Sequence, residues 1–116
     1  LFPFLEFIPR TQSQIEDLLV GDPMLVQLWI KLSGFNSAAA VWAAGNVSYP
    51  LFPFGVRPDS RSRKALTKFL SSDGTELTFS DHTDLAPTEA RIHYLVQSAP
   101  RRHILIGHVG RKLGIG

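Results

Sequence analysis

Apolar residues recur along this chain with two different periods, and the change of period divides it into a helical half and a strand-rich half. Ile15, Leu18 and Leu19 follow spacings of three and four, as on one face of an amphipathic helix. From Arg91 to Gln97 apolar and polar residues alternate, which is typical of a strand with one buried face. This order predicts an α+β fold in which the helices come first and pack on a sheet.

The first half is predicted to contain an N-terminal edge strand and two or three helices. The segment Phe2–Phe7 is aromatic and proline-flanked, which favours an edge strand. A first helix is expected from Thr11, whose hydroxyl can cap it. A second helix is expected from Asp22–Pro23, an N-cap followed by a proline at the first helical position, to Ser33–Gly34. The alanine-rich segment 38–44 predicts a short third helix.

The second half is predicted to form an antiparallel meander of about four strands. A proline-rich linker over residues 49–55 leads into it, and its aromatic side chains are expected to pack on the core. The predicted strands cover residues 64–70, 75–79, 91–97 and 102–109, with a Ser71–Gly74 hairpin turn after the first strand and a loop over 80–88.

Alternation also assigns the two faces of the predicted sheet. Ile92, Tyr94 and Val96 fall on one side of their strand and are expected to face the helices. The last strand is expected to contribute one of two pairs to the same core, either Ile104 and Ile106 or Leu105 and Val109.

Composition narrows the class of protein. Apolar residues make up 44% of the chain and the mean hydropathy is +0.04, which excludes an intrinsically disordered protein. The chain has no cysteine, so disulfide scaffolds and thiolate zinc sites are excluded, and a cytoplasmic location is expected. No run of about 18 apolar residues occurs, so no membrane span is expected. The length predicts a single domain over residues 1–116.

Basic charge is concentrated in the second half of the chain. Residues 1–56 carry two basic and four acidic side chains, whereas residues 57–116 carry ten basic and six acidic side chains, for a net charge of +2. Clustered Lys and Arg favour a polyanion-binding surface, because each neutralised phosphate releases counterions, and a solvated basic edge is the alternative. The residues predicted to bind nucleic acid are Arg61, Arg63, Lys64, Lys68, Arg101, Arg102 and Lys112.

Histidines and carboxylates are the other candidate functional groups. The segment 81–84, Asp-His-Thr-Asp, could ligate a metal ion, but neighbouring loop residues rarely converge on one ion, so a turn with no metal site and no cofactor is predicted. Alternation places His93 on the same strand face as Arg91, which makes it the candidate for proton transfer. A half-buried packing role is the more common one for a strand histidine.

Four segments together carry a family likeness. Arg91–Val96, a short turn, and His103–Lys112 form a strand that leads through a hairpin to an apolar strand closing on a glycine and two basic residues. Leu5–Arg10 looks like the family's opening strand, and Pro53–Pro58 lies where the family links its helices to the sheet. These segments span nearly the whole chain, and their order resembles that of the RelE/ParE toxin superfamily.

The resemblance implies a toxin that a cognate antitoxin protein neutralises. In the RelE branch, basic residues bind mRNA on the ribosome and stabilise charge during phosphodiester cleavage, so the chain would be an endoribonuclease. In the ParE branch the same fold inhibits DNA gyrase without hydrolysing RNA. Arg91 and Arg111 match basic positions of the family, and with His93 they are the predicted catalytic residues.

A second class of function is compatible with the same residues. The chain could be a non-catalytic basic domain, or a fragment of a larger chain, that binds nucleic acid or a partner protein. Such a domain needs the basic surface but no proton-transfer group. Both branches of the family and this alternative remain open from the sequence.

Overall fold

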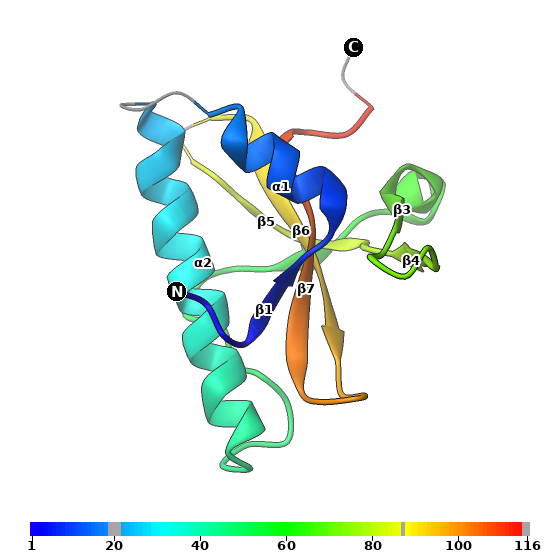
Figure 1. The fold of residues 1–116 in the computed structure, drawn as a ribbon. Helices are drawn as coiled ribbons and strands as arrows, with labels where there is room; N and C mark the ends of the chain where they lie inside the picture. Colours follow the sequence, from blue (N-terminus) through cyan, green and yellow to red (C-terminus); the bar gives the residue numbers. More distant parts are fainter. Residues whose placement is uncertain (19–21, 87, 115–116) are drawn as a thin grey trace.

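Helix α2 (Pro23–Ala43) lies on one face of a five-stranded sheet, α1 (Pro9–Glu16) lies along the edge of β7 (His103–Arg111) beyond β1 (Leu5–Phe7), and a small hairpin lies against the other face (Figure 1). The computed structural model describes residues 1–18, 22–86 and 88–114. This arrangement confirms the predicted α+β class. The elements in chain order are β1 (Leu5–Phe7), α1 (Pro9–Glu16), α2 (Pro23–Ala43), β2 (Arg57–Pro58), the 3₁₀ helix η1 (Arg61–Thr67), β3 (Lys68–Leu70), β4 (Glu76–Thr78), β5 (Asp81–Asp84), β6 (Ala90–Gln97) and β7 (His103–Arg111).

The main sheet is mixed, with its strands in the order β1-β7-β6-β5-β2. The strands β5, β6 and β7 form an antiparallel meander, and β2 extends it next to β5. At the other edge β1 runs parallel to β7, with Leu5 opposite Ile104 and Phe7 opposite Ile106. The hairpin β3–β4 is a separate two-stranded sheet, so the predicted single meander of about four strands is only partly realised.

Helix α1 begins before the predicted position. Ile8 is the N-cap and Pro9 takes the first helical position, where the missing N–H of a proline costs no hydrogen bond. The hydroxyl of Thr11 is therefore not a cap; it is buried and donates to the Ile8 carbonyl at 2.7 Å. The helix ends at Glu16, and Leu19 lies outside the described residues.

Helix α2 is a single helix of 21 residues that begins as expected, with the Asp22 side chain as its cap. The predicted end at Ser33–Gly34 is wrong, and the predicted third helix over 38–44 coincides with the C-terminal part of α2. Gly34 instead leaves room for an aromatic ring, because a Cβ there would lie 2.6 Å from Phe54 Cε2. Within the described ranges, no helix combines the length and the apolar character needed to cross a membrane.

The core between α2 and the sheet has the composition that strand alternation predicts. Tyr94 of β6 packs against Phe35 of α2 with ring centroids 4.8 Å apart. The linker aromatics Phe52 and Phe54 also pack on this core, as expected. Its main members from α2 and the two central strands are Leu28, Leu32, Phe35, Ile92, Tyr94, Ile104, Ile106 and Val109, with Val96 partly buried beside them.

A β-bulge in β7 explains why the last strand contributes members of both predicted pairs. The β6–β7 pairing shifts by one residue, which leaves Gly107 as the extra residue of β7. Because of this shift Ile106 and Val109 both face the helices. Leu105 lies on the opposite face, in a smaller cluster with Ile8 and Phe79.

Two predicted elements of the second half are wrong in their extent. Residues 64–67 belong to η1, and only Lys68–Leu70 of that predicted strand is extended. The predicted loop over 80–88 contains the strand β5, which consists of polar residues. Two of them contact polar partners: His82 faces Asp59, and Asp84 faces Arg91. The Ser71–Gly74 turn is confirmed, with the Gly74 N–H donating to the Ser71 carbonyl at 3.0 Å.

The substitution Gly107→Ala is expected to destabilise the protein, because a Cβ there would lie less than 3.0 Å from three ring carbons of buried Phe79. Overpacking of this kind costs about 1–3 kcal/mol, which urea unfolding would measure as a lower midpoint at unchanged slope. The matched control is Gly55→Ala, since nothing lies within 4 Å of a Cβ at that position. Equal stability of the two variants would contradict the packing of Phe79 against β7.

Candidate functional site

Polar side chains gather on the face of the sheet that is turned away from α2, here called the far face. In the β5–β6 register, His82 lies opposite His93 and Asp84 lies opposite Arg91. Residues two apart on a strand share a face, so all four side chains project from the far face. The structure therefore brings together the predicted pair Arg91 and His93 with two residues of the segment that was predicted to be a turn.

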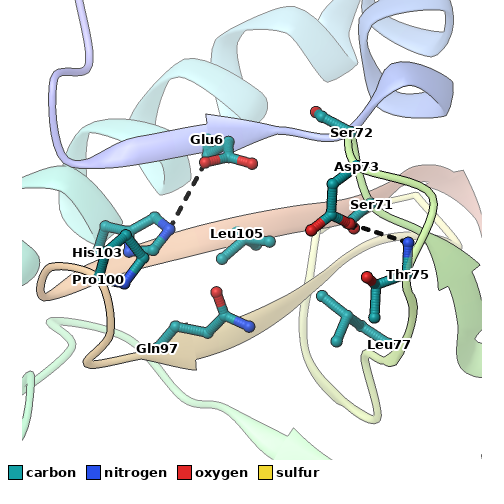
Figure 2. Close-up of a pocket in the computed structure, with 10 residues that line it drawn as sticks. All are labelled: Glu6, Ser71, Ser72, Asp73, Thr75, Leu77, Gln97, Pro100, His103 and Leu105. Atoms are coloured by element: carbon teal, nitrogen blue, oxygen red, sulfur yellow. Dashed lines mark hydrogen bonds and ion pairs between the residues drawn. The ribbon is translucent and has the colours of Figure 1, made fainter.

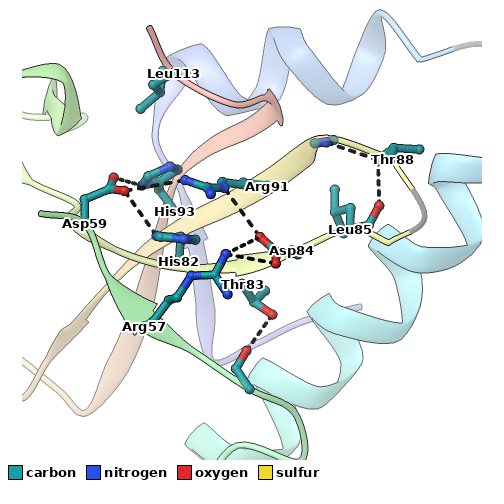
Figure 3. A network of polar contacts seen from close by, with 12 residues as sticks. Arg57, Asp59, His82, Thr83, Asp84, Leu85, Thr88, Arg91, His93 and Leu113 are labelled. Carbon is teal, nitrogen blue, oxygen red and sulfur yellow. Dashed lines mark hydrogen bonds and ion pairs between the residues drawn. The ribbon is translucent and has the colours of Figure 1, made fainter. Parts of the chain in front are cut away.

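Asp59, which follows β2, is the centre of this group, and its side chain is only 3% exposed. The Asp59 Oδ1 lies 3.5 Å from Arg91 Nη1 (Figure 3). It also lies 3.6 Å from Arg63 Nε. The Nδ1 atoms of His82 and His93 lie 3.7 Å and 3.8 Å from its two oxygens. We call these five residues the Asp59 cluster. Its single carboxylate balances part of the charge of two guanidinium groups, which are costly to bury unpaired.

Burial favours the neutral form of both histidines of the Asp59 cluster. Burial lowers the pKa of His93 to about 4. Burial also lowers the pKa of His82, and the positive charge of Arg91 lowers it further. His93 Nδ1 lies 2.8 Å from the Phe79 carbonyl, so it carries the hydrogen and Nε2 carries the lone pair. Because the His93 ring has no exposed surface, the far face would have to open before this residue could exchange a proton with a substrate.

A pocket of ≈ 270 Å³, here called the edge pocket, lies beside the Asp59 cluster. Arg91 reaches both sites, because its Nε lies 3.4 Å from Asp84 Oδ1 while its Nη1 faces Asp59. Arg57 also pairs with Asp84, at 3.1 Å, in a solvent-exposed contact. The lining residues are Arg57, Asp84, Thr88, Glu89, Arg91 and Lys112, so three cationic side chains outnumber two carboxylates.

The residues predicted to bind nucleic acid fall into two groups. Arg61, Lys64 and Lys68 are exposed on η1 and β3. Arg63 of η1 donates to the Leu113 carbonyl, which holds η1 against the C-terminal segment near Lys112. The second group, Arg101 and Arg102, lies in the turn between β6 and β7, and their guanidinium groups donate to the carbonyls of Pro3 and Trp42 respectively.

Arg111 is placed apart from Arg91 by the strand register. It pairs with Ala90, while Arg91 pairs with Gly110. Among the described residues, no hydrogen bond or ion pair joins the guanidinium groups of Arg91 and Arg111 to a common partner. The basic side chain that shares a pocket with Arg91 is Lys112.

A second polar pocket of ≈ 300 Å³ lies on the far face between the β3–β4 turn and the strands β1, β6 and β7 (Figure 2). His103 borders it, with Nε2 3.6 Å from Glu6 Oε1 and Nδ1 2.8 Å from the Arg101 carbonyl. Asp73 on the opposite wall accepts the Thr75 N–H at 2.9 Å. The polar groups of this pocket are largely engaged with one another, so it offers less binding capacity than the Asp59 cluster.

Comparisons of the chain with protein-family models, with curated proteins and with solved structures found no match. The residues of the far face are therefore the basis for any functional conclusion.

The sequence analysis did not select Asp59, Arg57 or Asp84 as site residues, and it set His82 aside. Asp59 follows Arg57 and Pro58 in a segment with no regular pattern, 23 and 34 residues from its histidine partners. The one available signal is that Asp59 is the only acid in the basic segment 57–68. As a metal ligand His82 was weighed against its neighbours in the segment 81–84, whereas its partners lie on β6 and after β2.

The variant Asp59→Asn is expected to destabilise the protein strongly, because it leaves Arg63 and Arg91 without their shared buried carboxylate. Removal of one partner of a buried ion pair costs about 3–5 kcal/mol. The matched control is Asp84→Asn, which removes the other carboxylate from Arg91 at a side chain that is 45% exposed, and should cost about 0–1 kcal/mol. Thermal or urea unfolding would compare them, and a larger loss for Asp84→Asn would contradict the central place of Asp59.

Proposed function

We propose that this chain is a RelE/ParE-type toxin that acts in the cytoplasm and binds an mRNA phosphate in its edge pocket. The observation that carries the proposal is the convergence of Arg57, Arg91 and Lys112 on one pocket at the edge of the sheet. A guanidinium group binds phosphate through two parallel hydrogen bonds, and it retains its charge at any physiological pH.

The order of the elements supports the same proposal. An opening strand and two helices come first and a three-stranded antiparallel meander comes last, with β2, η1 and the β3–β4 hairpin between them. The opening strand lies beside the last one. This is the order on which the resemblance of the sequence to the RelE/ParE superfamily rests. Fold alone does not establish an activity, so the pocket rather than the topology is the object of the test.

The role of each side chain follows from its contacts. Asp59 orients Arg91 from the buried side, while Asp84 holds it from the exposed side. An RNA phosphate would replace the exposed Asp84 as the partner of Arg91 and Arg57, and charge that develops on the phosphate during cleavage would be stabilised there. Lys112 and Glu89 line the same pocket and are the groups within it that could move a proton.

An apolar groove supports the part of the proposal that concerns a protein partner, the cognate antitoxin. It has a volume of ≈ 560 Å³ and lies between α1, α2 and β1. Trp29, which lines the groove, is 53% exposed, and Val26 and Ile30 on α2 are also exposed. Large exposed apolar residues grouped in this way are typical of a surface that binds another protein.

One observation favours the alternative of a non-catalytic nucleic-acid- or protein-binding domain. Arg57 and Arg91 are both paired with carboxylates, and the predicted proton-transfer residue His93 is fully buried. A binding domain would need the cationic pocket but no reaction in it.

Expression of the chain in a bacterial host is expected to arrest growth, with ribosome-dependent cleavage of mRNA. The variant Arg91→Lys keeps the charge but loses the planar fork, so toxicity should fall at least about tenfold, which corresponds to about 1.4 kcal/mol. Arg111→Lys tests the second family position in the same assay. The matched control is Arg101→Lys, which changes an arginine in the β6–β7 turn and should remain toxic.

The outcomes separate the candidate functions. Growth arrest with intact mRNA and inhibited DNA supercoiling would indicate the ParE type, in which DNA gyrase is the target. Tolerated expression of the wild-type chain would support the binding domain. A fully toxic Arg91→Lys variant would exclude the edge pocket as the site.

Binding of single-stranded RNA to the purified chain is expected to weaken steeply with salt, since each phosphate contact adds about 0.7 to the slope of log K against log salt concentration. The variant Lys112→Gln should lower this slope by about one contact. Arg102→Gln is the comparison variant. Arg102 is also predicted from the sequence to bind nucleic acid, but it lies in the β6–β7 turn and donates to the Trp42 carbonyl of α2. The edge-pocket proposal therefore expects its removal to leave the slope unchanged. A slope near zero for the wild-type chain would contradict phosphate binding.

A further inference from the structure

The Asp59 cluster contains more unpartnered polar atoms than a buried site normally tolerates. Asp59 Oδ2, Arg63 Nε, both ring nitrogens of His82 and Nε2 of His93 are buried and have no hydrogen-bond partner within the described part of the chain. More than nine-tenths of buried polar groups in proteins have such a partner, so five unpartnered atoms in one cluster require an explanation.

Their arrangement is that of a metal-ligand set. One oxygen of Asp59 and one nitrogen from each histidine ring lie within 4.8 Å of one another. Zinc bonds to oxygen and nitrogen are about 2.0–2.2 Å long, which places neighbouring ligand atoms roughly 3.3–3.6 Å apart. The His82 Nδ1 and Asp59 Oδ1 atoms are 3.7 Å apart, close to that spacing. The His93 nitrogen that faces Asp59 is Nδ1, which is engaged with the Phe79 carbonyl, so His93 would have to bind the ion through Nε2 and the three side chains would have to move closer together.

We infer that Asp59, His82 and His93 bind a divalent transition-metal ion of the Zn²⁺ type, independently of the function proposed above. Two imidazoles and one carboxylate favour such an ion over Mg²⁺ or Ca²⁺, which prefer oxygen ligands. Three protein ligands leave one position of a tetrahedral zinc site for a water molecule.

The surroundings of the three ligands match those of known metal sites. His93 Nδ1 donates to the Phe79 carbonyl, which leaves a lone pair on the other ring nitrogen. Ligating histidines are commonly oriented by a hydrogen bond of this kind to a backbone carbonyl. Arg63 and Arg91 contact Asp59 Oδ1, whereas its Oδ2 faces His93 Nδ1 at 3.8 Å and has no hydrogen-bond partner among the described residues.

The position of the site assigns the ion a structural role. Asp59 follows β2, His82 lies on β5 and His93 lies on β6, so a single ion would join three segments of the far face. All three residues are buried, which keeps substrates away from the ion. The positive charges of Arg63 and Arg91 oppose a cation, so the affinity should rise when one of them is neutralised.

The test uses the purified, untagged chain, stripped with a chelator and titrated with Zn²⁺ alone by calorimetry and by thermal unfolding. One ion per chain is expected to bind, with a melting temperature that rises with free Zn²⁺. His82→Gln and Asp59→Asn should each weaken Zn²⁺ binding more than about 100-fold. This exceeds the loss of about 10–100-fold that follows when a residue that only orients a ligand is removed. His103→Gln, at a histidine near Glu6, is the matched control and should bind as the wild type does.

Two further measurements keep the inference testable if a ligand variant does not fold. The visible spectrum of the wild-type chain with Co²⁺ should show the intense bands of a tetrahedral site, and Arg63→Gln should bind Zn²⁺ several-fold more tightly than the wild type. The inference is wrong if the wild-type chain shows no saturable Zn²⁺ binding, or an octahedral Co²⁺ spectrum. It is also wrong if a folded His82→Gln variant binds as tightly as His103→Gln.

Discussion

Strand β6 is buried on both of its faces, although only one of them is apolar. The rest of the structure depends on how the polar side chains of the other face are compensated. On the helix-facing side Ile92 and Tyr94 meet α2 and bury apolar surface in the usual way. On the far face Arg91 and His93 are also largely removed from water, and burial of such groups requires compensation. Asp59 supplies the compensating charge, and the chain between β2 and β5 has to fold over the sheet to bring it there.

This constraint also explains which parts of the structure could be predicted from the sequence. The alternation of Ile92, Tyr94 and Val96 identified β6 and its buried face, because one side of that strand meets an apolar layer. The polar segment Asp81–Asp84 has no such layer on its far-face side, so β5 gave no strand signal. Gly34 was taken for the end of a helix because local propensity carries no information about the Phe54 ring that packs against it. The Asp59 cluster joins residues from three segments, and only the tertiary fold brings them together.

The candidate sites are distributed between the two faces of the sheet. The Asp59 cluster and the edge pocket share Arg91, so the orientation of this guanidinium in the pocket is set by buried contacts behind it. The apolar groove lies on the helix side, next to α2 and β1. A macromolecule bound in that groove would leave the edge pocket accessible unless it also reached across the sheet.

The parallel pairing of β1 with β7 has a consequence for how the chain is made. Leu5 lies against Ile104, so the first strand finds its partner only about a hundred residues later. Helices α1 and α2 involve local contacts and can form while the ribosome is still at work, but β7 emerges after the other described elements. Until β7 is made, the apolar faces of the helices have no complete sheet to cover them, and exposed apolar surface of this kind favours aggregation.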